Sequence, residues 1–246
     1  MDIPRQLKRV AESFAEGLRS VLGDRLCAAW LHGAAVLPGD VPTGDIDFHV
    51  LLASPLGEGE RRMLEQLHDR LCSDYPPLGC GMDGYYVLLD DARGSSPPRS
   101  QMWRRATDHS WALHRAHLLA GRGITLHGPE PSEIIVPPAW SELEEALESE
   151  MAYVLDHLSE YPDYCVLQLC RIVMSHESRD VVISKSEAAE WAVSALPEFS
   201  SLVLTARRAY PGRAMPKQRD MMLEGLPLLV RVARGRIARA GSGAGR

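Results

Sequence analysis

Two aspartates separated by one residue, Asp45 and Asp47, are the side chains of this sequence best suited to chemistry. They open the segment DIDFHVLL, whose apolar run predicts a buried β-strand over residues 46–52. Side chains two apart in a strand point to the same face, so the carboxylates should project together. Such pairs bind Mg²⁺ and leave positions for substrate phosphates. The pair predicts a magnesium site, although two acids at this spacing are also common on solvated faces and in turns.

The residues before this pair favour the metal-site interpretation. Residues 26–32, LCAAWLH, predict a first strand, and Gly33 marks a tight turn after it. A glycine lets the backbone approach a phosphate without a side chain in the way. An acid pair at the mouth of a core strand also costs solvation energy unless a cation compensates it.

A third acid, Asp83, stands at the start of another predicted strand, residues 81–89, which is rich in aromatic and branched side chains. Two strands that both open with acids suggest a single carboxylate cluster, of which Asp83 is the third member. The alternative is an aspartate that serves only a turn before Gly84.

The composition is that of an ordinary globular protein. The 246 residues are 45% hydrophobic and 24% charged, with 27 basic and 33 acidic side chains and a net charge of −6. This balance argues against a nucleic-acid partner and is compatible with a cationic small substrate. No apolar run reaches about 18 residues and no signal peptide is recognisable, so we expect a cytoplasmic protein. Its cysteines are expected to be mostly buried free thiols: Cys27, Cys72, Cys80, Cys165 and Cys170.

The pattern of apolar residues predicts a mixed first half and a helical second half. The first half should contain helices at residues 4–22, 58–72 and 109–120 and a short strand at 123–127. Prolines and glycines between residues 129 and 140 mark a domain junction. The second half should contain helices at residues 141–159, 163–176, 185–196, 198–210 and 217–238. Ser184 and Glu187 form a capping box, and Gly225 and Pro227 should kink or split the last helix.

At these motifs a family resemblance emerges. Gly33, a spacer and Asp45-x-Asp47 resemble the signature of the polymerase-beta-like nucleotidyltransferase superfamily. The whole chain resembles more closely the aminoglycoside adenylyltransferases that modify streptomycin and spectinomycin, because VLQLCRI, ISKSEAAEWAVSALP and ARRAYPG look like their helical domain. The resemblance implies an α+β protein. Residues 1–130 would form a nucleotidyltransferase domain with a mixed sheet flanked by helices, residues 140–240 an all-α helical bundle, and residues 241–246 a disordered tail.

The resemblance also implies an activity. The enzyme would transfer AMP from ATP to a hydroxyl of an aminoglycoside and release pyrophosphate, at a site between the two domains. Asp45 and Asp47 would bind one or two Mg²⁺ ions, and Asp83 would replace the family's usual glutamate as general base. The resembling enzymes are usually monomers, so a monomer is expected.

The nucleotide-binding residues carry over from both halves of the family pattern: Gly33, Ala34, Gly44, Arg171, Lys185 and Tyr210. Lys185 lies in the first turn of a capped helix, where a cation is unfavourable unless an anion such as a triphosphate lies beside it. A helix salt bridge is the alternative for Arg171, and packing at a helix end is the alternative for Tyr210.

The acceptor-binding residues align less cleanly. Trp103 could stack on a sugar, and Asp156, Glu160 and Asp163 could contact a cationic antibiotic, with surface or core roles as the alternatives. Two family serines are replaced, by Ala34 and Gly44, and each lost hydrogen bond to a charged group is worth about 1.5–3 kcal/mol. These departures keep two alternatives open, a nucleotidyltransferase that modifies a protein or RNA and a catalytically impaired nucleotide-binding protein.

Overall fold

The protein forms two compact units in this computed structural model, which describes residues 5–36, 45–210, 212 and 214–243. Among these residues, the first unit comprises 5–36 and 45–142, and the second begins at Leu143. Each unit has its own core, and each is described by itself.

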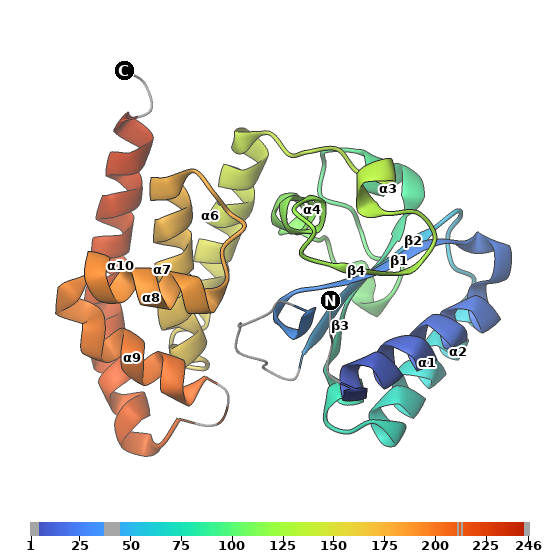
Figure 1. The fold of residues 1–246 in the computed structure, drawn as a ribbon, viewed down its shortest axis with the longest axis horizontal. Helices are drawn as coiled ribbons and strands as arrows, with labels where there is room; N and C mark the ends of the chain where they lie inside the picture. The colour runs from blue at the N-terminus through green and yellow to red at the C-terminus, as the bar shows by residue number, and fades with distance from the viewer. Residues whose placement is uncertain (1–4, 37–44, 211, 213, 244–246) are drawn as a thin grey trace. The chain divides into compact units, whose positions relative to one another are not determined.

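The first unit is built on a mixed four-stranded sheet of β1 (Leu26–His32), β2 (Ile46–Leu52), β3 (Met82–Leu88) and β4 (Ile124–His127). Their order is β3-β2-β1-β4, with β1 antiparallel to both neighbours and β2 parallel to β3 (Figure 1). The parallel pair requires a crossover, which α2 (Glu58–Asp74) supplies. β1 and β2 begin and end at the residues predicted from the sequence.

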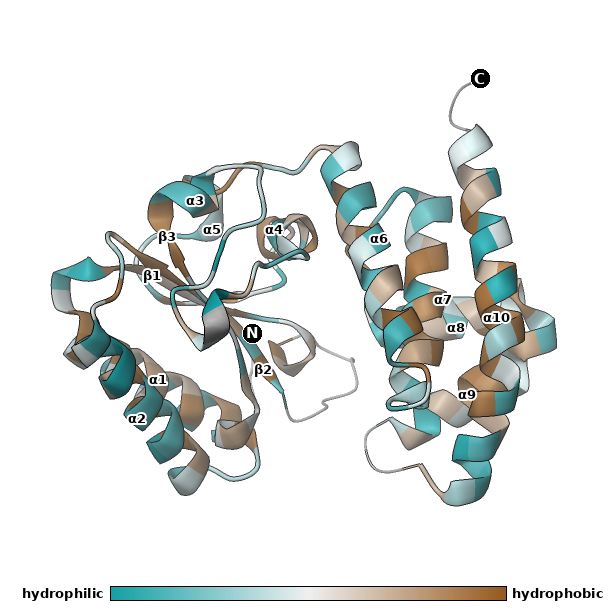
Figure 2. Ribbon diagram, turned by 180° about the vertical axis from the view of Figure 1, so that it is seen from behind, coloured by the Kyte–Doolittle hydropathy of each residue, from teal (hydrophilic) through white to brown (hydrophobic). Residues whose placement is uncertain are grey.

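Helices cover both faces of this sheet. α1 (Arg5–Leu22) and α2 pack their apolar stripes on the face that carries Phe48 and Val50. α4 (Trp111–Leu119) places Trp111 on the other face, against Trp30 and Leu51. Figure 2 shows the hydrophobic strands between these helices. The remaining short elements are η1 (Gly23–Arg25), η2 (Ala34–Val36), η3 (Leu78–Gly81), α3 (Leu89–Arg93), η4 (Trp103–Arg105) and α5 (Pro131–Ile134).

The second unit is helical. It contains α6 (Trp140–Asp156) from Leu143 on, α7 (Pro162–Ser178), α8 (Lys185–Ala195), η5 (Pro197–Phe199), α9 (Ser200–Ala209) and α10 (Pro216–Gly243). α7 is the centre of its core and packs against α8, α9 and α10. The predicted capping box opens α8, because Glu187 N–H donates to Ser184 Oγ at 3.1 Å and Ser184 N–H donates to Glu187. The predicted α+β fold class is confirmed.

The last helix departs from its prediction. α10 continues through Gly225 and Pro227 as one helix, so of the two predicted outcomes the split does not occur and the kink stays a prediction. Burial of Met222, Leu226 and Leu229 outweighs the hydrogen bond that the proline removes. The helix also extends to Gly243, three residues into the predicted disordered tail, while residues 244–246 lie outside the described part.

The prediction of buried free thiols was wrong for two of the cysteines. Cys72, in the last turn of α2, is disulfide-bonded to Cys80 in η3. The chain reverses between them at residues 75–77, which brings their Cα atoms to 4.0 Å. Cys165 and Cys170 are buried free thiols as expected, and Cys27 is a half-buried one. Among the helices described, none is long and apolar enough to cross a membrane.

Candidate active site

Strand register brings two of the three predicted acids together. Asp47 on β2 pairs with Asp83 on β3, and His32 on β1 pairs with Asp47 from the other side. Partners in register point to the same face, so these three side chains form one row across the sheet. Asp45 precedes Asp47 by two residues and is exposed, as is Asp83, while Asp47 is half-buried. The register thus places an exposed group of carboxylates at the start of β2.

Position 33 requires a glycine for two reasons, the backbone conformation of its turn and the nearby carboxylate of Asp47. Its φ of +75° lies in the region that favours glycine. A Cβ atom at this position would lie 1.7 Å from Asp47 Oδ2, so the missing side chain makes room for the carboxylate. The sequence suggested a glycine that lets a phosphate approach, but it gave no sign of this contact with Asp47. The neighbouring Ala34 begins η2, whereas Gly44 lies outside the described residues.

The donor set of the cluster fits a hard cation. Asp45 and Asp47 offer carboxylate oxygens, the ligands that Mg²⁺ prefers, and Asp83 adds a third carboxylate in the same row. The space left by Gly33 keeps the Asp47 carboxylate clear of the turn. Mg²⁺ binding by Asp45 and Asp47 therefore fits the residues and stays a prediction.

A buried polar network lies next to the acids and was missed by the sequence reasoning. His32 Nε2 is 2.9 Å from His49 Nδ1, and His49 Nε2 is 2.9 Å from Asp108 Oδ2. His114 Nδ1 contacts the same Asp108 oxygen at 3.0 Å, and Ser110 N–H donates to the other at 3.1 Å. His32, His49 and Asp108 are buried. The signal that could have found it is a histidine within each of two apolar strands.

The protonation of this network follows from its burial. Burial lowers the pKa of His32 well below its ordinary value and also lowers the pKa of His49, so both imidazoles are neutral. Burial alone would raise the pKa of Asp108, but its contacts with His114 and His49 outweigh it and hold the pKa below its usual range. Asp108 is therefore ionised and accepts hydrogen bonds from both rings.

Trp103 does not lie beside Asp47 and Asp83. Its ring contacts His68, Tyr86 and Phe48, with centroids 5.0, 5.7 and 6.1 Å away. Phe48 and Tyr86 belong to the core on the opposite face of the sheet from Asp47. Trp103 is nevertheless 42% exposed, so part of its ring is accessible at that face.

In the second unit, two of the predicted nucleotide-binding residues meet around a tyrosine. Lys185 Nζ lies 5.2 Å from the ring centroid of Tyr164 and 5.3 Å from that of Tyr210. Both distances are within the range of cation–π attraction. Burial raises the pKa of Tyr164, with a further contribution from Glu150. The sequence reasoning missed Tyr164, although it lies two helical turns before Arg171 on α7.

The other predicted cation, Arg171, has a carboxylate partner. Its guanidinium is 4.0 Å from Glu150 of α6, and Gln168 donates to the same Glu150 oxygen at 2.5 Å. The salt bridge considered as the alternative is therefore present. The charge of Arg171 also opposes the rise in the pKa of Tyr164, the tyrosine whose ring contacts Lys185.

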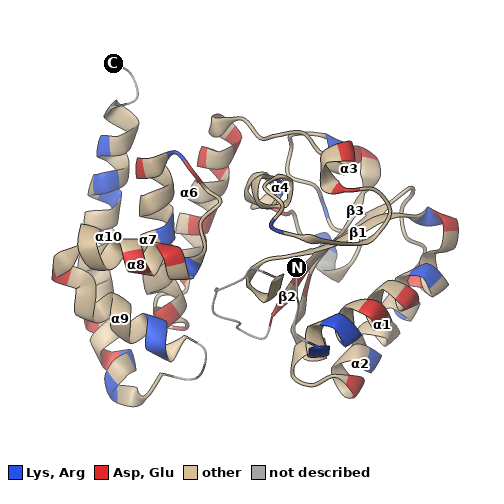
Figure 3. Cartoon of the chain, viewed as in Figure 1, with Lys and Arg blue, Asp and Glu red and all other residues tan. Residues whose placement is uncertain are grey.

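The predicted acceptor-binding acids lie around the end of α6 and the start of α7. Asp156 and Glu160 are exposed, and Asp163 is half-buried in the first turn of α7, where it accepts from the Tyr164 amide at 3.0 Å. Figure 3 shows further acidic residues along α6. These positions leave their predicted role open.

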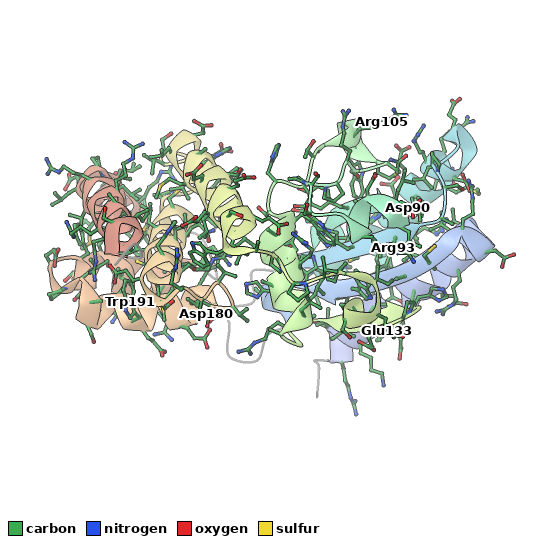
Figure 4. All side chains as sticks on the ribbon, turned by 90° about the horizontal axis from the view of Figure 1, so that it is seen from above. Asp90, Arg93, Arg105, Glu133, Asp180 and Trp191 are labelled. Atoms are coloured by element: carbon green, nitrogen blue, oxygen red, sulfur yellow. A yellow bond between two sulfur atoms is a disulfide. The ribbon has the colours of Figure 1, made fainter. Side chains whose placement is uncertain are left out.

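A surface pocket of about 470 Å³ occurs in the first unit, lined by α3 and the loop that follows it. Figure 4 labels Asp90 and Arg105 from its lining, together with Arg93, which is 3.5 Å from Asp90. No predicted site residue in the described part of the chain lines this pocket, so it does not bear on the acidic row.

Comparisons with known proteins agree with these features. Residues 135–231 match the family model of the aminoglycoside adenylyltransferase C-terminal domain. The chain is 23% identical over 248 residues to a spectinomycin 9-adenylyltransferase of Campylobacter jejuni, an alignment that covers 93% of each protein. Its fold matches that of a spectinomycin adenyltransferase from Enterococcus faecialis, solved with ATP and spectinomycin, with a TM-score of 0.74 and 16% identity over 94% of this chain and 100% of that one. The resemblance predicted from the motifs is confirmed over almost the whole length of the chain.

Proposed function

We propose that this protein is an adenylyltransferase that transfers AMP from ATP to a hydroxyl of an aminoglycoside of the spectinomycin and streptomycin class, releasing pyrophosphate. The observation that carries the proposal is the β2–β3 register, which sets Asp83 beside Asp47 with Asp45 two residues earlier. Relatives of similar length that bear this activity in their names support the choice of reaction.

The acids have distinct roles in this proposal. Mg²⁺ bound by Asp45 and Asp47 would neutralise charge on the phosphates. Asp83 accepts the proton of the acceptor hydroxyl, whose oxygen then attacks the α-phosphorus while pyrophosphate leaves. The exposure of Asp83 suits this role, because a general base must come within hydrogen-bond reach of the substrate. Catalysis then consists mainly of positioning and charge stabilisation.

The second unit contributes cations to the nucleotide. Lys185 and Arg171 are proposed to neutralise the departing pyrophosphate, and Tyr210 to contact the nucleotide beside them. The rings of Tyr164 and Tyr210 restrict the lysine side chain before ATP binds, which lowers the entropy lost on binding. Ala34 offers no hydroxyl to a phosphate, so we expect ATP to bind more weakly than it would to a serine at this position.

The acceptor is proposed to meet the acidic side chains Asp156, Glu160 and Asp163, since aminoglycosides are cationic. Trp103 stays a weaker candidate for a stacking role, because its ring packs on the sheet face opposite Asp47. A cytoplasmic location and a monomeric state complete the proposal and rest on the sequence alone.

Pyrophosphate release with ATP and Mg²⁺ across an aminoglycoside panel tests the proposal, with mass spectrometry of the antibiotic to detect the added AMP. We expect release with spectinomycin or streptomycin, and its loss in the Asp47→Asn and Asp83→Asn variants. The exposed Asp24→Asn variant, which also removes one negative charge, serves as the matched control and should stay active.

Each contrary outcome has a defined meaning. ATP binding without turnover of any aminoglycoside would refute the proposed acceptor and direct the search to other hydroxyl compounds. Activity that survives Asp47→Asn would refute the assigned site. Absence of both ATP binding and turnover would show that the substitutions at residues 34 and 44 mark a protein that has lost the reaction.

A further inference from the structure

The three histidines beside the acidic row have the arrangement of metal ligands. His32 and His49 come from adjacent strands and His114 from α4, and one nitrogen from each lies within 4.8 Å of the others. Their ring centroids are 4.7 to 5.1 Å apart. Imidazole nitrogens suit zinc and neighbouring transition metals, whereas Mg²⁺ prefers the oxygens of the carboxylate row.

Asp108 fixes which nitrogens can bind a metal. An ionised carboxylate only accepts hydrogen bonds, so His49 must carry its proton on Nε2 and His114 must carry its proton on Nδ1. A metal would then be bound through the other nitrogen of each ring, His49 Nδ1 and His114 Nε2. A carboxylate that orients a histidine through its other nitrogen is the usual outer support of a metal ligand, and here one carboxylate orients two.

His32 completes the set. Its Nε2 faces His49 Nδ1 at 2.9 Å, so without a metal one proton is shared between these two nitrogens, and it belongs to His32 because His49 already carries one. Ligand nitrogens in a tetrahedral zinc site lie about 3.4 Å apart. The pair is close to that separation, and one ligand nitrogen from each of the three rings lies within 4.8 Å of the others.

We propose that His32, His49 and His114 bind one transition-metal ion of the zinc class, separate from the Mg²⁺ site proposed at Asp45 and Asp47. Three protein ligands leave the fourth position of zinc to a water molecule or another oxygen donor. On binding, His32 loses the proton on Nε2 and takes one up on Nδ1, so the ring stays neutral and Nε2 becomes the ligand. The ion then links β1, β2 and α4 next to Asp47. Its role is therefore to hold these elements together rather than to take part in AMP transfer.

Titration of metal-free protein with Co²⁺ in millimolar Mg²⁺ tests this site, because excess Mg²⁺ occupies the carboxylates. We expect one equivalent of Co²⁺ to bind with the intense visible absorption of a four-coordinate nitrogen site, and Zn²⁺ to displace it. His114→Gln should lower the affinity at least 100-fold, and Asp108→Asn should lower it about 10–100-fold. The exposed His109→Gln variant is the matched control and should bind like wild type.

Two results would overturn the site, namely no Co²⁺ or Zn²⁺ binding by folded wild-type protein and unchanged affinity in His114→Gln. Circular dichroism of each variant separates loss of a ligand from loss of the fold. The Asp47→Asn variant separates this site from the proposed reaction, because it should lose AMP transfer and keep zinc. Loss of zinc together with AMP transfer in that variant would contradict two separate sites.

Discussion

Replacing Gly33 by alanine should remove most of the activity while leaving the fold in place. The added Cβ would lie 1.7 Å from Asp47 Oδ2, although real Cβ atoms essentially never come within 3.0 Å of another atom. The carboxylate must therefore move by the difference, about 1.3 Å, because it is the end of a side chain and yields more easily than the backbone. A misplacement of about 1 Å at a reacting centre can reduce the rate by about 100-fold.

The same substitution also strains the backbone, and this cost needs its own control. An alanine with a φ near +75° costs about 1–2 kcal/mol. Gly121 has a φ of +73°, and no atom lies within 4 Å of the position that its Cβ would take. Gly121→Ala should therefore lose the same stability without touching Asp47.

The assay compares kcat/KM for pyrophosphate release and the free energy of unfolding in urea. We expect both variants to lose similar stability, and only Gly33→Ala to lose about 100-fold in kcat/KM. Equal activity of the two variants would refute the idea that the bare glycine protects the position of Asp47. A much larger loss of stability in Gly33→Ala than in Gly121→Ala would show that the backbone of the turn, rather than the Asp47 carboxylate, had moved to relieve the clash.

Three further outcomes follow from the structure. Asp83→Asn should lower kcat by about 10²–10⁴-fold, because the proposed role of Asp83 is proton transfer. The urea midpoint should not change, because the side chain is exposed. An undiminished kcat would exclude Asp83 as the base. Ser184→Ala should cost about 1 kcal/mol of unfolding free energy, because it removes the N-cap of α8, and the exposed Ser201→Ala should cost less. Burial lowers the pKa of His68 from 6.5 to about 4. As the pH falls, the unfolded chain therefore binds a proton at His68 before the folded protein does. Stability should be complete above about pH 6.5 and fall by up to about 3 kcal/mol as the pH drops through 4, and urea curves of His68→Gln should show a shallower decline.

Much of the fold could be predicted because its signals are local. The bounds of β1 and β2 follow from continuous apolar runs, and the start of α8 follows from Ser184 and Glu187 three residues apart. The grouping of acids was also accessible, since strands that open with Asp47 and Asp83 become neighbours once they pair in parallel.

The rest depends on contacts between distant parts of the chain. Asp108 meets His49 across 59 positions, and no local pattern encodes that meeting. The Cys72–Cys80 bond depends on a reversal of the chain after α2, and the continuity of α10 at Pro227 depends on side chains that pack around it. Trp103 illustrates the same limit, because its side of the sheet is decided by Phe48 and Tyr86 rather than by its neighbours in sequence.

The alternation of β2 has a consequence for how this protein can evolve. Phe48 and Val50 face one core while Asp47 and His49 face the other side, so the strand that fills the core also aims the acid. Inserting or deleting one residue within β2 would exchange the two sets and destroy stability and chemistry at once. Changes of length are therefore expected in the loops rather than within β2.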